Sequence, residues 1–159
     1  MGSADVEPAT IIAIRGILLI IFVFGLVGTA TELLLLEHTE KLPQLIPLGL
    51  IAIGLVVLGW RFVDPRPASM RVLRGTMILF VVSGLVGILL HYRGNVEFEL
   101  EMYPSLQGLA LFRKAIQGAT PALAPGTMIQ LGLIGWTYTY RHPLLVQSRT
   151  KKPNKGETE

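Results

Sequence analysis

Acidic and apolar residues alternate near the middle of the chain. The stretch from Val96 to Tyr103 reads VEFELEMY, with acids at positions 97, 99 and 101. Strict alternation is typical of an extended strand with one acidic and one apolar face. Carboxylates on one face can bind a hard cation, and a histidine beside them favours a transition metal. The stretch is therefore a candidate metal-binding element.

Three more residues could join this element on the same side of the protein. Glu32 is the only carboxylate inside an apolar block, while His38 and His91 flank the ends of apolar blocks. No metal motif of fixed spacing is present, so we predict no cofactor and keep a divalent cation as an alternative. The candidate outer-face ligand or metal site comprises Glu32, His38, His91, Glu97, Glu99 and Glu101.

Other chemistries have little support in the sequence. The chain has no cysteine, which excludes disulfides, thiolate ligands and cysteine nucleophiles. The serines lack the glycine context of a nucleophile elbow, and no glycine-rich loop is followed by the lysine of a phosphate site. Haem ligation would need facing histidines, and only His38 and His91 could approach each other. We predict no catalytic residue and a non-enzymatic protein.

The composition indicates an integral membrane protein. Of 159 residues, 51% are hydrophobic and 16% are charged, and the mean hydropathy is +0.55. The apolar residues come in blocks, and roughly 20 of them are needed to cross a bilayer core about 30 Å thick. Four segments qualify, so the sequence predicts an all-α protein with transmembrane helices at about 11–36, 45–63, 73–91 and 122–140.

The basic residues predict the orientation of these spans. If both termini are cytoplasmic, ten of the fourteen lysines and arginines lie on the inner side, and six of the eleven acids lie outside. We expect the cytoplasmic membrane of a bacterium as the location. The net charge of +3 is explained by this topology and by contact with anionic lipids, so we expect no nucleic-acid partner.

Two stretches of the chain resemble each other. RGILLIIFVFGLVGTATE, residues 15–32, and RGTMILFVVSGLVGILLH, residues 74–91, share seven identities. PQLIP at 43–47 is matched by PALAP at 121–125, and each precedes a span that ends in Gly-Trp. The sequence therefore predicts a four-helix bundle made of two duplicated, like-oriented helical hairpins, 11–63 and 73–140.

Small and polar residues inside the spans predict how the helices pack. Glycines three residues apart leave a shallow face for a neighbouring helix, which we expect to join spans one and three, and an amide can form an interhelical hydrogen bond. Arginines and tryptophans at span ends can anchor in the interfaces. The packing residues are Gly25, Gly28, Gly84, Gly87 and Gln130, and the anchors are Arg15, Arg74, Trp60 and Trp136.

The segments outside the spans differ in character. We expect a cytoplasmic N-terminal segment at 1–10, an arginine-rich cytoplasmic loop at 64–72 and a flexible basic tail at 141–159. The outer loop, 92–121, should contain the short strand and then a short amphipathic helix between Ser105, a possible N-cap, and Gly118.

Two functions follow as expectations. The first is an accessory or scaffold subunit whose outer loop docks a protein partner, or caps the bundle, among membrane lipids. The alternative is a small carrier or cation-binding membrane protein that uses the outer acidic and histidine residues. Both expectations are compatible with a homo-oligomer joined through the glycine faces. A membrane enzyme is the third alternative.

Overall fold

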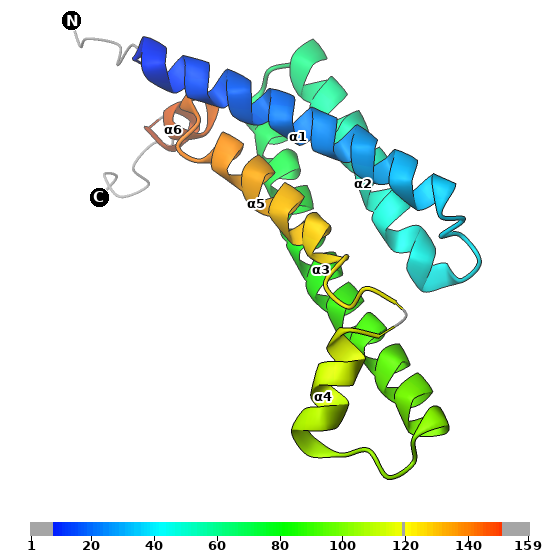
Figure 1. The fold of residues 1–159 in the computed structure, drawn as a ribbon. Coiled ribbons are helices and arrows are strands. Elements are labelled where there is room, and N and C mark those ends of the chain that lie inside the picture. Colours follow the sequence, from blue (N-terminus) through cyan, green and yellow to red (C-terminus); the bar gives the residue numbers. More distant parts are fainter. Residues whose placement is uncertain (1–7, 119, 151–159) are drawn as a thin grey trace, which may run out of the picture.

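The computed structural model describes residues 8–118 and 120–150, with side chains described up to residue 146. These residues form six helices and no strand (Figure 1). The helices are α1 (Ala9–Leu35), α2 (Leu42–Val63), α3 (Pro67–Met102), α4 (Gly108–Ile116), α5 (Gly126–Thr139) and α6 (Pro143–Thr150).

Three of these helices are long and apolar enough to cross a membrane, which makes the chain a membrane protein. They are α1, α2 and α3, with 27, 22 and 36 residues. Each contains at least the roughly 20 residues that a bilayer core requires. Most side chains of these helices point outward and are apolar, as expected for surfaces that face lipid.

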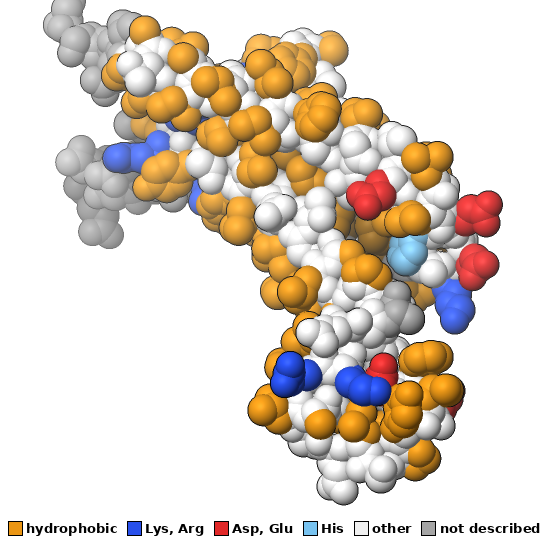
Figure 2. Space-filling model, viewed as in Figure 1, with side chains coloured by type: hydrophobic (Ala, Val, Ile, Leu, Met, Phe, Trp, Pro, Cys, Tyr) orange, Lys and Arg blue, Asp and Glu red, His pale blue; other side chains and the backbone are white. Residues whose placement is uncertain are grey.

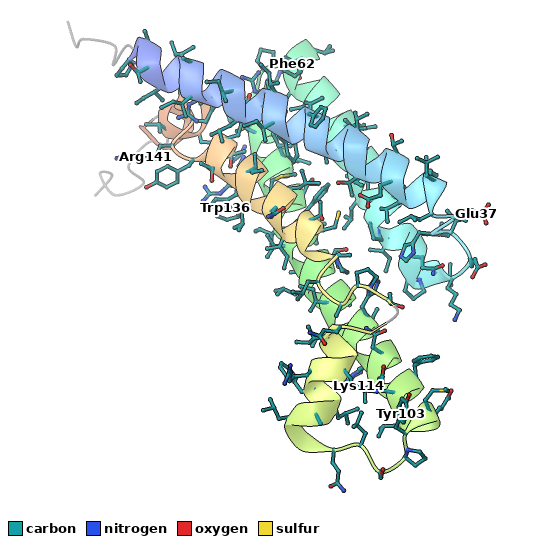
Figure 3. The ribbon with its side chains drawn as sticks, in the orientation of Figure 1. Glu37, Phe62, Tyr103, Lys114, Trp136 and Arg141 are labelled. Carbon is teal, nitrogen blue, oxygen red and sulfur yellow. The ribbon has the colours of Figure 1, made fainter. Side chains whose placement is uncertain are left out.

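Helix α3 is the centre of the arrangement. It packs most extensively against α5 and next against α2, while α1 lies on α5 (Figure 1). The core where these helices meet is built from large apolar side chains: Phe22, Leu26, Ile51, Met77, Phe80 and Leu131. We call the end where α1 starts and α6 lies the basal end, and the end with the α1–α2 loop around Glu37 the apical end (Figure 3).

The fourth predicted span is shorter than the sequence suggested. The segment 122–140 becomes a helix only over Gly126–Thr139, which is 14 residues or about 21 Å. Residues 120–125 form a turn before it, because Pro121 and Pro125 lack the N–H groups that a longer helix would use. The structure therefore provides three long apolar helices and one short one.

The predicted strand at 96–103 is wrong. Helix α3 continues through this stretch to Met102. Glutamate, leucine and methionine are good helix formers, and extending an existing helix needs no new nucleus. The two-residue alternation of acids was a weaker signal than this continuous helix.

Three other boundaries also change. The short helix in the outer loop is present as α4, but its N-cap is Gln107 and not Ser105. The loop at 64–72 shrinks to 64–66, because α3 begins at Pro67, a favourable first helical residue. In the tail, which was expected to be flexible, Pro143–Thr150 forms α6, while residues 151–159 lie outside the described part.

Arg15 links α1 to the C-terminal end of α5 at the basal end of the bundle. Its guanidinium donates hydrogen bonds to the carbonyl oxygens of Tyr138, at 2.7 Å, Tyr140, at 3.0 Å, and Arg141, at 3.3 Å. These carbonyls lie at the C-terminal end of α5, where helix carbonyls lack intrahelical partners and a cation is favourable. The arginine thus ties α1 to α5 instead of only anchoring in an interface.

Replacing Arg15 with leucine should lower the free energy of unfolding by about 2 kcal/mol, because a charged donor to several carbonyls is lost. Arg15→Lys should lose about half as much, since an ammonium keeps the charge but not the forked geometry. Unfolding in mixed micelles measures both variants. An Arg15→Leu protein as stable as the wild type would contradict this assignment.

Candidate functional site

A cavity of about 760 Å³ opens in the apical half of the molecule. Its walls come from α1, the α1–α2 loop, α2, α3 and the segment from Thr120 to Met128. The walls are mainly apolar, with leucine, valine, isoleucine and proline predominating. The volume falls in the range of roughly 300–1,000 Å³ that small-molecule sites occupy.

One face of α3 runs along the length of this cavity. Its lining residues recur at spacings of three and four, which places them in one stripe on the helix. From the deep end to the apical end, they are Leu79, Val82, Ser83, Val86, Gly87, Leu90 and His91. The first and the last are twelve positions apart on the helix, so the cavity extends for about 18 Å along α3.

Glu32, His38 and His91 meet at the apical end of the cavity. All three line it, and the rings of His38 and His91 lie 6.1 Å apart between centroids. Nδ1 of His91 lies 3.1 Å from the Pro121 carbonyl oxygen, which fixes the histidine against the turn before α5. Figure 2 shows a histidine and an acidic side chain exposed on this part of the surface, among apolar side chains.

Glu97, Glu99 and Glu101 do not line the cavity. Because α3 is helical here, residues two apart point in nearly opposite directions, so the three carboxylates do not share a face. Glu97 and Glu101 are exposed, whereas Oε2 of Glu99 lies 3.5 Å from Nζ of Lys114. Within residues 8–118 and 120–150, no group of three metal-ligating side chains is placed to hold a metal ion.

These acids belong instead to a lobe made of the end of α3 and α4. Lys114 of α4 also lies over the ring of Tyr103, 3.8 Å from its centroid (Figure 3). Asn95 is 3% exposed, and its amide donates to the carbonyl oxygens of Ala115, at 2.8 Å, and Thr120, at 2.6 Å. Sequence reasoning missed Asn95, although a lone asparagine in a helix is a signal for a buried hydrogen bond.

The predicted packing glycines contact α5 and the turn before it. A methyl group on Gly25 would lie 2.5 Å from Leu131, and Gly84 and Gly87 would meet Pro125 in the same way. α5 therefore fills the place where spans one and three were expected to meet. Gly28 has nothing within 4 Å of such a methyl group, and Gln130 is exposed, so neither packs as predicted.

The residues proposed as interface anchors all lie near the basal end. The guanidinium carbon of Arg74 is 4.3 Å from the centroid of a Trp136 ring, a cation–π contact between α3 and α5. Trp60, at the end of α2, remains 40% exposed. Figure 3 shows Trp136 and Arg141 at this end, far from Glu37.

No protein family, no curated protein and no solved structure matches this chain. The cavity combines an elongated apolar interior with three ionisable side chains at one end.

The two matched proline stretches of the sequence contribute equivalent positions to the cavity wall. Pro43 and Pro47 line it at the start of α2, and Pro121 and Pro125 line it before α5. Ile46 and Leu50 also correspond, in the same register, to the lining residues Ala124 and Met128. Sequence reasoning noted the two stretches but assigned them no shared site.

Proposed function

We propose that this chain is a non-enzymatic carrier or receptor in the membrane, which binds an apolar, chain-like molecule in the apical cavity. The observation that carries the proposal is the shape and lining of this cavity. An interior about 18 Å long with apolar walls and polar groups at one end matches a molecule with a tail and a head.

The proposed topology places this cavity within reach of the outer leaflet. With both termini cytoplasmic, Arg74 lies near the inner interface, and His91, seventeen residues or about 25 Å further along α3, lies near the outer one. A molecule could then enter sideways from the lipid. The same charge distribution supports the cytoplasmic location of both termini, and a bacterial cytoplasmic membrane is part of this proposal.

Two like-oriented hairpins, derived from an internal repeat, are part of this proposal. The shared register of Pro43 and Pro47 with Pro121 and Pro125 in the cavity wall supports it. Glu32 and His91 also occupy equivalent positions in the two aligned stretches, and both line the cavity. A site formed where two repeats meet is a common arrangement in membrane carriers.

Filling the cavity should remove binding. A photoreactive diazirine on a 16-carbon alkyl chain, added to the protein in nanodiscs, should label α3 between Leu79 and His91 in a saturable way. Ser83→Phe should reduce this saturable labelling at least tenfold, because the ring would occupy the space of the chain. Mass spectrometry of the labelled peptides measures the effect.

A matched control and a second variant make this test specific. Leu85→Phe adds an aromatic ring to the same helix at a position that is 52% exposed and outside the cavity, so its labelling should equal that of the wild type. Ala124→Phe fills the cavity from the turn before α5 and should act like Ser83→Phe. Equal saturable labelling of all four proteins would refute the proposal.

A second candidate function is an accessory subunit that docks a partner protein through the lobe of α3 and α4. α3 has 36 residues, or about 54 Å, and is too long to lie wholly within a bilayer core about 30 Å thick. The end of α3 in the lobe would then lie outside the bilayer core. The lobe still exposes apolar side chains, which is typical of an interaction surface. They are Phe98, Met102, Leu109 and Phe112, with Leu109 72% exposed.

Point variants in α4 test this second candidate, since α4 carries two of these exposed apolar side chains. If a partner subunit copurifies at fixed stoichiometry, the double variant Leu109→Ser and Phe112→Ser should release it while the protein still inserts. Retention of that partner by the double variant would show that the lobe is not its binding surface.

A further inference from the structure

The polar groups at the apical end of the cavity restrict the kind of head group it can take. Glu32 comes from α1, His38 from the α1–α2 loop and His91 from α3. Among the described residues that line the cavity there is no lysine or arginine. A head group here would therefore meet a carboxylate and two imidazoles of the cavity wall, and no lysine or arginine of that wall.

The hydrogen bond of His91 determines which of its ring nitrogens faces a ligand as an acceptor. A carbonyl oxygen can only accept, so Nδ1 of His91, 3.1 Å from the Pro121 oxygen, must carry the hydrogen. In the neutral imidazole the other nitrogen, Nε2, then has a free lone pair. In its neutral form, His91 thus offers an acceptor and not a donor through Nε2.

Glu32 adds a second acceptor. An ionised carboxylate accepts hydrogen bonds and cannot donate them. The Glu32 side chain is exposed at the cavity rim, on the last turns of α1, where it stays accessible to a head group.

We propose that the ligand is an amphiphile whose head donates hydrogen bonds, either an ammonium or a hydroxyl group on an apolar tail. This inference rests on the proposed function of the cavity. A donor head matches the acceptors of Glu32 and His91, and an ammonium would also neutralise the carboxylate. A carboxylate or phosphate head would face the like charge of Glu32, and no lysine or arginine lines the cavity to offset the repulsion.

Competition among probes of equal chain length tests the head group. Hexadecylamine, hexadecan-1-ol and hexadecanoic acid are added to protein in nanodiscs labelled by the photoreactive 16-carbon probe. The amine or the alcohol, or both, should displace the probe at concentrations at least tenfold lower than the acid requires. Displacement by the acid at an equal or lower concentration would overturn the inference while leaving the apolar cavity site intact.

Variants separate the two kinds of donor head. If the head is an ammonium, Glu32→Gln should raise the concentration of amine required at least fivefold and leave the alcohol unchanged. If the head is a hydroxyl, the alcohol should compete at least as well as the amine in both proteins. Glu40→Gln removes an exposed acid of the nearby α1–α2 loop that does not line the cavity, and it should have no effect.

The remaining outcome concerns the proposed function itself. If none of the three compounds displaces the probe at any concentration, the cavity does not bind chain-like molecules in a saturable manner. The proposed function then fails, and the inference about the head group fails with it.

Discussion

Replacing Gly84 with alanine should destabilise the protein by about 3 kcal/mol, at the upper end of the usual cost of overpacking. A methyl group on Gly84 would lie 2.8 Å from the carbonyl oxygen of Pro125 and 2.9 Å from the backbone nitrogen of Ile129. Backbone atoms cannot rotate away as a side chain can, so α5 would have to move from α3. Unfolding in mixed micelles measures the loss.

Gly75→Ala is the matched control in the same helix. Gly75 is exposed, and a methyl group there would have nothing within 4 Å. Alanine is a better helix former than glycine by about 1 kcal/mol, so Gly75→Ala should be neutral or slightly stabilising. If the two variants had the same stability, the close packing of α3 on α5 would be refuted.

Replacing Asn95 with alanine should open the lobe of α3 and α4. The Asn95 side chain holds the Ala115 and Thr120 carbonyls and accepts a hydrogen bond from the Thr120 N–H, at 3.2 Å. Removing it leaves the buried Ala115 carbonyl and two partly buried backbone groups of Thr120 without this partner, at a cost of about 3 kcal/mol. Amide hydrogen exchange in α4 should therefore accelerate about a hundredfold.

Glu97→Ala serves as the control for the lobe. Glu97 lies two residues further along α3 and is exposed, so its loss should leave the exchange rates of α4 unchanged. Exchange in α1 and α2 should stay the same in both variants, because neither helix makes extensive contact with α4. Unchanged exchange of α4 in Asn95→Ala would mean that α4 is held by other contacts.

The membrane helices could be predicted because an apolar block of sufficient length has few other stable structures. The blocks at 11–36 and 45–63 match α1 and α2 within a few residues. The alternation from Val96 to Tyr103 led to a wrong prediction of a strand, because residues two apart share one face only when the backbone is extended. In the structure the backbone of this stretch is helical, because α3 continues from Pro67 to Met102.

The candidate site could be predicted only in part. Glu32, His38 and His91 come together at one cavity, as their positions at span ends suggested. The cavity itself could not be foreseen, because it depends on α5 being short and on the turn at 121–125 forming part of the cavity wall. The packing of Gly25, Gly84 and Gly87 against α5 and the turn before it could not be predicted either, because it also depends on where α5 begins.

Native mass spectrometry of the protein, extracted gently from its own membrane, tests the central claim most directly. The wild-type protein should carry one apolar molecule of reproducible mass per chain, and Ser83→Phe should lose it while Leu85→Phe keeps it. A wild-type protein that carries no such molecule, or a Ser83→Phe protein that carries it equally well, would contradict the claim that the apical cavity is a binding site.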